Sequence, residues 1–146
     1  MQEWWRWLEA TELASRVRDG VWLYPAVETL HIIGFSILVG AAVIFDLRLL
    51  GISPVIRVSD LARHVLPWAR GSFFLIVVPT GALLFATQAT TLATSRVFQL
   101  KLLLIVVAGL NTFLFHSGRV ASKTAGAASL ILWIAVIVCG RLLAYV

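Results

Sequence analysis

The stretch "ETLHIIGFSILVGAAVIF", Glu28 to Phe45, decides the fold of this chain. After His31 it is apolar as far as Phe45, with Ser36 as its polar interruption. A helix needs about 20 predominantly apolar residues to cross a bilayer. Because backbone groups in lipid must bond within their own segment, such a run predicts a transmembrane helix. It also raises a question, because Glu28 and His31 are ionisable groups at the point where the chain enters lipid.

The composition of the whole chain supports a membrane protein. The 146 residues are 60% hydrophobic and 13% charged, whereas soluble domains are about 45–50% apolar and about 25% charged. The mean hydropathy is +0.95. We therefore expect one integral membrane domain that covers residues 1–146.

Four apolar runs are long enough to span, at roughly 26–49, 68–90, 97–116 and 125–145. They predict an all-α fold, a four-helix transmembrane bundle with short antiparallel connections after the second and third helices. In the longer connection at 50–67, Ser59 is a candidate N-cap and Pro67 a candidate break, which predicts a short interfacial helix. Pro79 should kink the second spanning helix, and Thr80 could satisfy a freed backbone group.

Residues 1–20 are too polar to span the membrane. Glu9, Glu12 and Arg16 share one helical face, and apolar residues lie roughly opposite. This pattern predicts an N-terminal amphipathic interfacial helix on the membrane surface.

The charge balance restricts the partners. The pI is about 10.4, but Lys and Arg cluster between apolar runs, where they anchor helix ends, so no nucleic-acid partner is expected. The expected partners are the lipid bilayer and a quinone or redox partner protein, with a homo-oligomer left open. The expected location is the bacterial inner (cytoplasmic) membrane, crossed several times.

Ionisable residues at membrane depth are costly and usually turn inward or serve a site. At 100° per residue, Glu28, His31 and Asp46 fall within an arc of about 60° on the first spanning helix. Lys101 and Asn111 share a face with small residues on the third. We expect these two polar faces to meet. For Asp46, an ion pair with Arg70 or Arg119 is the simpler interpretation, and gating of protons or quinone the alternative.

The depths of these groups define two levels. Glu28, His31, Lys101 and Arg141 belong near one membrane face, and Asp46, His64 and His116 near the other. His31 and His116 are separated by about 20 Å of helix and cannot share one iron, whereas His64 and His116 could.

The functional hypothesis is a b-type haem. His31 is the candidate axial ligand to the haem iron, with Glu28 or a water fixing its tautomer, and Lys101 or Arg141 would hold propionates. Lys101 is also a candidate sixth ligand. The alternative is structural: Glu28 and Lys101 form an ion pair while His31 bonds across the bundle. His64 and His116 are further cofactor-binding candidates, or solvated interfacial residues.

Other chemistries find less support. Cys139 is the only cysteine, so no intrachain disulfide and no thiolate metal site can form. Cu(I) prefers thiolate or thioether ligands, and the only methionine is Met1.

"WLYPAVETLHIIGFSILVGAAVIFDLRLLG" followed by "FQLKLLLIVVAGLNTFLFH" resembles an uncharacterised family of bacterial four-helix membrane proteins, a domain of unknown function. "PTGALLF" and "FQLKLLLIVVAGLN" are more distantly similar to the copper-resistance D (CopD) domain. "LHIIG" and the third-helix lysine resemble HemJ-type protoporphyrinogen oxidase, a four-helix haem b protein. By that resemblance His31 and Lys101 match the family's first-helix histidine and third-helix lysine, although its second-helix tryptophan and early third-helix histidine are not in place here.

The sequence therefore predicts an integral membrane protein that binds b-type haem and acts in membrane electron transfer. A HemJ-like porphyrinogen oxidase is the first alternative. A non-catalytic membrane subunit or permease with a structural polar core is the second.

Overall fold

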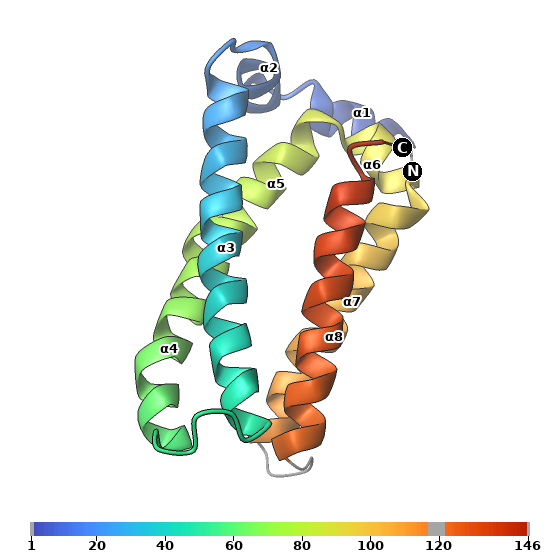
Figure 1. Ribbon diagram of the computed structural model, residues 1–146. Coiled ribbons are helices and arrows are strands. Elements are labelled where there is room, and N and C mark those ends of the chain that lie inside the picture. The colour runs from blue at the N-terminus through green and yellow to red at the C-terminus, as the bar shows by residue number, and fades with distance from the viewer. Residues whose placement is uncertain (1, 117–121, 146) are drawn as a thin grey trace.

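The computed structural model describes residues 2–116 and 122–145, and every regular element in these ranges is a helix (Figure 1). Four of these helices are long enough to cross a membrane. Three of them are single elements: α3 (Leu23–Leu49), α7 (Arg96–His116) and α8 (Ser122–Leu142). The fourth, which follows α3 in the chain, runs without a break through α4 (Val58–Ser72), the π-helical turn η1 (Phe73–Val77) and α5 (Val78–Thr87). All four are long and apolar enough to cross a membrane. The predicted all-α fold with four spanning helices is confirmed.

The second spanning helix differs in extent from the prediction. It begins at Val58 rather than near residue 68, and Pro67 lies inside α4 instead of breaking the chain. Pro67 is on the exposed side of α4, so its ring does not have to fit between helices. Packing of α4 against α3 offsets the one backbone hydrogen bond that a proline removes. A separate short helix, α6 (Ala89–Thr94), follows α5.

The N-terminal segment forms two short helices, α1 (Gln2–Glu9) and α2 (Glu12–Asp19), where one was predicted. The break has a local cause, because the Thr11 side chain accepts a hydrogen bond from the backbone N–H of Ala14 and so caps α2. The two helices pack on the end of the bundle at α5, α6 and α3. Glu9 accepts a hydrogen bond from the backbone N–H of Thr90 at 2.7 Å, which ties α1 to the start of α6.

The spanning helices pack as a row with one open side. α4 packs on α3, α3 on α8, and α8 on α7 (Figure 1). Among the described residues, no Cα of α4 or α5 lies within 8 Å of a Cα of α7. The bundle is therefore closed at α3 and α8 and open between α4 and α7.

Small residues allow the close contacts in this row, as is usual for membrane helices. A Cβ on Gly34 would lie 2.5 Å from Cγ2 of Ile76, so α3 touches η1 closely there. The Ser72 hydroxyl donates to the Gly34 carbonyl at the same place. On the other side of α3, a Cβ on Gly126 would lie 3.1 Å from the Asp46 carbonyl oxygen, which brings α8 against α3.

Candidate functional site

His31 has a defined hydrogen-bond partner on α5. Its Nδ1 lies 2.8 Å from the Thr80 hydroxyl, and that hydroxyl donates its own proton to the Ile76 carbonyl at 2.6 Å. The Thr80 oxygen must therefore accept, and Nδ1 of His31 must carry the proton. In the neutral ring, this assignment places the lone pair on Nε2.

The backbone of α5 also supports the imidazole ring. A Cβ on Gly81 would lie 3.1 Å from Cε1 of His31, so the ring lies directly against the helix at this glycine. Thr80 and Gly81 together orient the half-buried ring. The sequence signal was present in "PTG", where Thr80 was expected to bond a backbone carbonyl but not to meet His31.

Lys101 lies on α7, in the second turn from its N-terminal end, and is half-buried. Its ammonium nitrogen would be 3.5 Å from a Cβ on Gly140 of α8. Glu28 is exposed and makes no ion pair with Lys101 in the described part of the chain. The ion pair that the sequence left as an alternative is therefore not formed.

Arg141 does not join this group. It is exposed, donates to the hydroxyl of Tyr145, and stacks its guanidinium over the same ring at 4.7 Å from the centroid. The expected meeting of the two polar faces is not found: no Cα of α3 lies within 8 Å of a Cα of α7 among the described residues, and Lys101 lies against Gly140 of α8 instead.

The other two histidines bond within their own helices. Nδ1 of His64 donates to the Asp60 carbonyl at 3.0 Å, and Nδ1 of His116 donates to the Thr112 carbonyl at 2.8 Å. Both rings are exposed, and in the neutral form both carry the lone pair on Nε2. Within residues 2–116 and 122–145, no group of three or more His, Cys, Asp or Glu side chains could hold a metal ion.

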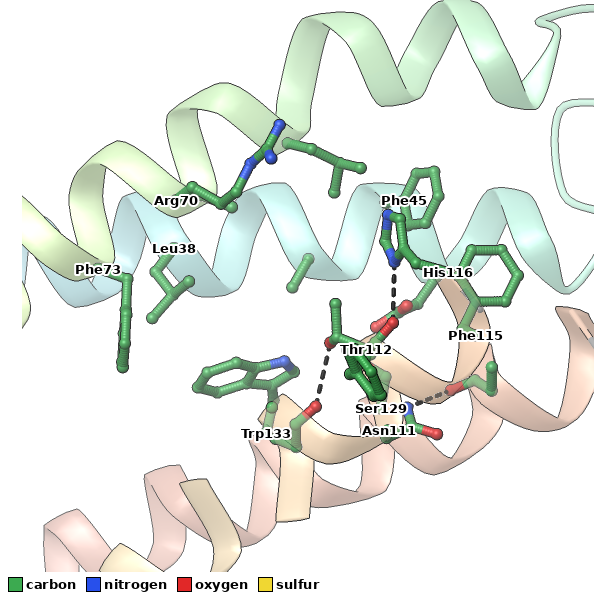
Figure 2. A pocket seen from close by; sticks show the side chains of 18 of the residues that line it. Leu38, Phe45, Arg70, Phe73, Asn111, Thr112, Phe115, His116, Ser129 and Trp133 are labelled. Atoms are coloured by element: carbon green, nitrogen blue, oxygen red, sulfur yellow. Dashed lines mark hydrogen bonds between the residues drawn. The ribbon is translucent and has the colours of Figure 1, made fainter. Parts of the chain in front are cut away.

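A cavity of about 430 Å³ lies between α3, α4 with η1, α7 and α8. Figure 2 shows its lining side chains, which converge from all four helices. Neither His31 nor Lys101 lines it, because it occupies the other half of the bundle, whereas His116 does line it. Six aromatic residues form much of its wall: Phe45, Phe73, Phe74, Phe113, Phe115 and Trp133.

Two charged groups of the cavity lining, Asp46 and Arg70, make no ion pair in the described ranges. Asp46 is 5% exposed, the Ser129 hydroxyl faces its carboxyl, and its Oδ2 atom has no hydrogen-bond partner. Arg70 is exposed toward the opening and pairs with no carboxylate. The expected pair of Asp46 with Arg70 is therefore not made, and Arg119 lies outside the described residues.

The cavity was not predicted from the sequence. Its polar residues were placed at one level, but its walls come from positions on four helices, and no periodicity along one helix reveals them.

Comparison with protein-family models, with characterised protein sequences and with solved structures finds no match to this chain. The function must therefore be inferred from the residues themselves.

Proposed function

We propose that this chain is a b-type haem protein of the bacterial inner membrane, with His31 as an axial ligand. It would pass electrons between a membrane donor, such as a quinol, and a partner. The observation that supports this most directly is the hydrogen bond of Nδ1 to Thr80, which places the lone pair of the neutral His31 ring on Nε2. Histidines that bind metals usually donate their other ring N–H to a fixed acceptor, which sets the tautomer and orients the ring.

Lys101 supports the same proposal. It is a half-buried cation at the level of His31, and it makes no ion pair in the described part of the chain. A charge inside a membrane protein is costly unless it is paired or serves a site. A propionate would supply the missing negative charge, and this role suits Lys101 better than Glu28 or Arg141, which are exposed.

Bound haem would supply one-electron chemistry. The chain's own contribution would be to present Nε2 of His31, to neutralise a propionate with Lys101, and to keep water out with apolar helices. The resemblance of "LHIIG" and Lys101 to HemJ-type proteins points to the same two residues.

An absorption spectrum of the protein purified from haem-replete cells tests this proposal. A Soret band is expected for the unmodified chain, with about one haem per chain. His31→Ala should abolish or shift the band. His64→Ala is the matched control, because the hydrogen bond of the His64 ring in the described ranges is to Asp60 of its own helix. Absence of a Soret band would refute the haem proposal, and a band unchanged in His31→Ala would remove His31 as the ligand.

Two further measurements separate the alternatives. If the band is lost in His116→Ala and kept in His31→Ala, the haem lies at the cavity end of the bundle instead. Turnover of a porphyrinogen by the haem-loaded protein would favour the HemJ-like oxidase over simple electron transfer.

A further inference from the structure

The cavity beside Asp46 is open toward lipid. Its walls at α4 and α7 have no Cα pair within 8 Å among the described residues, while α3 and α8 close its back. In a spanning bundle, the side on which two wall helices do not meet faces the acyl chains. A ligand dissolved in the bilayer can therefore enter sideways.

The walls are suited to a ring. Phe45 and Phe115 both line the cavity and meet edge to face, with ring centroids 6.2 Å apart. Trp133 also lines it and is held edge to face at 6.1 Å by Phe35, which is not part of the lining. Aromatic side chains prefer offset or edge-to-face contact with another ring. The volume of about 430 Å³ is within the roughly 300–1,000 Å³ of ordinary ligand pockets.

Asp46 supplies the polar end. Asp46 is 5% exposed and lines the cavity, Ser129 hydrogen-bonds to its carboxyl, and Oδ2 has no hydrogen-bond partner within the described residues. A buried acceptor without a donor destabilises the fold unless a ligand provides one. A hydroxyl group is a neutral donor that fits an unpartnered carboxyl oxygen.

The charges argue for a neutral ligand. Asp46 and Arg70 both line the cavity, and their formal charges cancel. An ammonium headgroup would meet the Arg70 charge, and a phosphate headgroup would meet the Asp46 charge. A ring with two oxygens, one that donates to Asp46 and one that accepts from Arg70, satisfies both side chains.

We propose that this cavity binds a membrane-soluble hydroquinone, an aromatic diol on an apolar tail, with Asp46 as the acceptor of one hydroxyl. The choice of a quinol rests on the proposed electron transfer, because it names the donor class, but the binding itself requires no haem. His31 and Lys101 lie outside the cavity, so the two sites can be tested separately.

The test uses a decyl-tailed hydroquinone, kept reduced without oxygen, and the full chain purified without haem. Binding is followed by quenching of tryptophan fluorescence, since Trp133 lines the cavity. Asp46→Leu should weaken binding at least about tenfold, the value for one hydrogen bond to a charged group. Glu28→Leu removes an exposed carboxylate from the same helix outside the cavity and should leave binding unchanged.

A second pair of variants keeps the test valid if Asp46→Leu does not fold. Gly109 lines the cavity and has nothing within 4 Å of an added Cβ, so Gly109→Leu should fill the cavity and abolish binding. Gly40 has the same open surroundings on α3 and does not line the cavity, so Gly40→Leu should bind like the unmodified chain.

Three results would overturn the proposal: no saturable quenching, equal binding by Gly109→Leu and Gly40→Leu, or displacement of the ring by decyl alcohol at equal concentration. The last result would mean that the cavity takes any apolar chain. If hydroquinone binds but the haem experiment gives no Soret band, the haem proposal is refuted and the cavity proposal stands. If a Soret band is seen but hydroquinone does not bind, the cavity proposal is refuted and the haem proposal stands.

Discussion

The Nδ1 atom of His31 lies 2.8 Å from the Thr80 hydroxyl, which itself donates a hydrogen bond to the carbonyl of Ile76. This short chain of hydrogen bonds joins α3 to the second spanning helix at the turn that contains Pro79. Since hydrogen bonds between membrane helices fix their rotation as well as their distance, the pair orients both the imidazole and α5.

Thr80→Val should destabilise the protein by about 1–3 kcal/mol, because the half-buried Nδ1–H of His31 loses its acceptor. Thermal unfolding in detergent, followed by circular dichroism, measures the loss. Thr80→Ser keeps the hydroxyl and should remain close to the unmodified protein. If the Thr80→Val and Thr80→Ser variants unfold at the same temperature, the His31–Thr80 hydrogen bond contributes nothing to stability.

Gly34→Ala should destabilise the protein by about 1–3 kcal/mol through overpacking. The added Cβ would lie 2.5 Å from Cγ2 of Ile76 and 2.8 Å from its Cβ, so the two helices must separate. Gly40→Ala is the control on the same helix, because an added Cβ there has nothing within 4 Å. Equal unfolding temperatures for the two variants would show that α3 does not touch η1 at Gly34.

Glu9→Ala should loosen the N-terminal helices by breaking the bond to the backbone N–H of Thr90. The expected cost is about 1 kcal/mol, and hydrogen exchange in residues 2–19 should accelerate. Glu12→Ala removes an exposed pair with Arg16, whose side chains are 79% and 73% exposed, and should cost at most about 0.5 kcal/mol. Similar exchange in both variants would contradict the tie between α1 and α6.

Four spans place both chain ends on one side of the membrane (Figure 1). Reporter fusions at the N-terminus and after Ala144 should therefore indicate the same compartment. A reporter inserted at Gly51, in the connection between α3 and α4, should indicate the opposite one. A fusion at Ala144 that matches the insertion at Gly51 would contradict the four-span arrangement.

The sequence predicted the spans and the two levels of polar groups because both depend on spacing within single helices. Apolar length predicted α3, α7 and α8 closely. The inward face was predicted correctly for His31 and Asp46 but wrongly for Glu28, which is exposed. Three features depend on contacts between helices and could not be predicted in this way: Pro67 inside α4, the contact of His31 with Thr80, and the gap between α4 and α7. The sequence allowed an ion pair between Glu28 and Lys101 because the two residues have similar depths in the membrane. The pair does not form because the rotation of α3 about its axis leaves Glu28 exposed.

The π-helical turn at Phe73–Val77 contains one residue more than an α-helix would need to cover the same stretch. Ser72 and Thr80 are eight positions apart, so in an unbroken α-helix they would point about 80° away from each other. A π turn takes up one extra residue and reduces this to about 20°, which lets Ser72 reach Gly34 and Thr80 reach His31 on the same face of α3.

The wider turn also gives the ring of Pro79 room where an α-helix would press it against a carbonyl. One residue of the turn is thus equivalent to an insertion into an α-helix, and the π turn accommodates it without changing the contacts on either side. Deleting Leu75, which is 78% exposed, together with Pro79→Ala should restore a straight α-helix with both contacts intact. A single deletion within α3 between Gly34 and Asp46 should instead turn Asp46 away from the cavity.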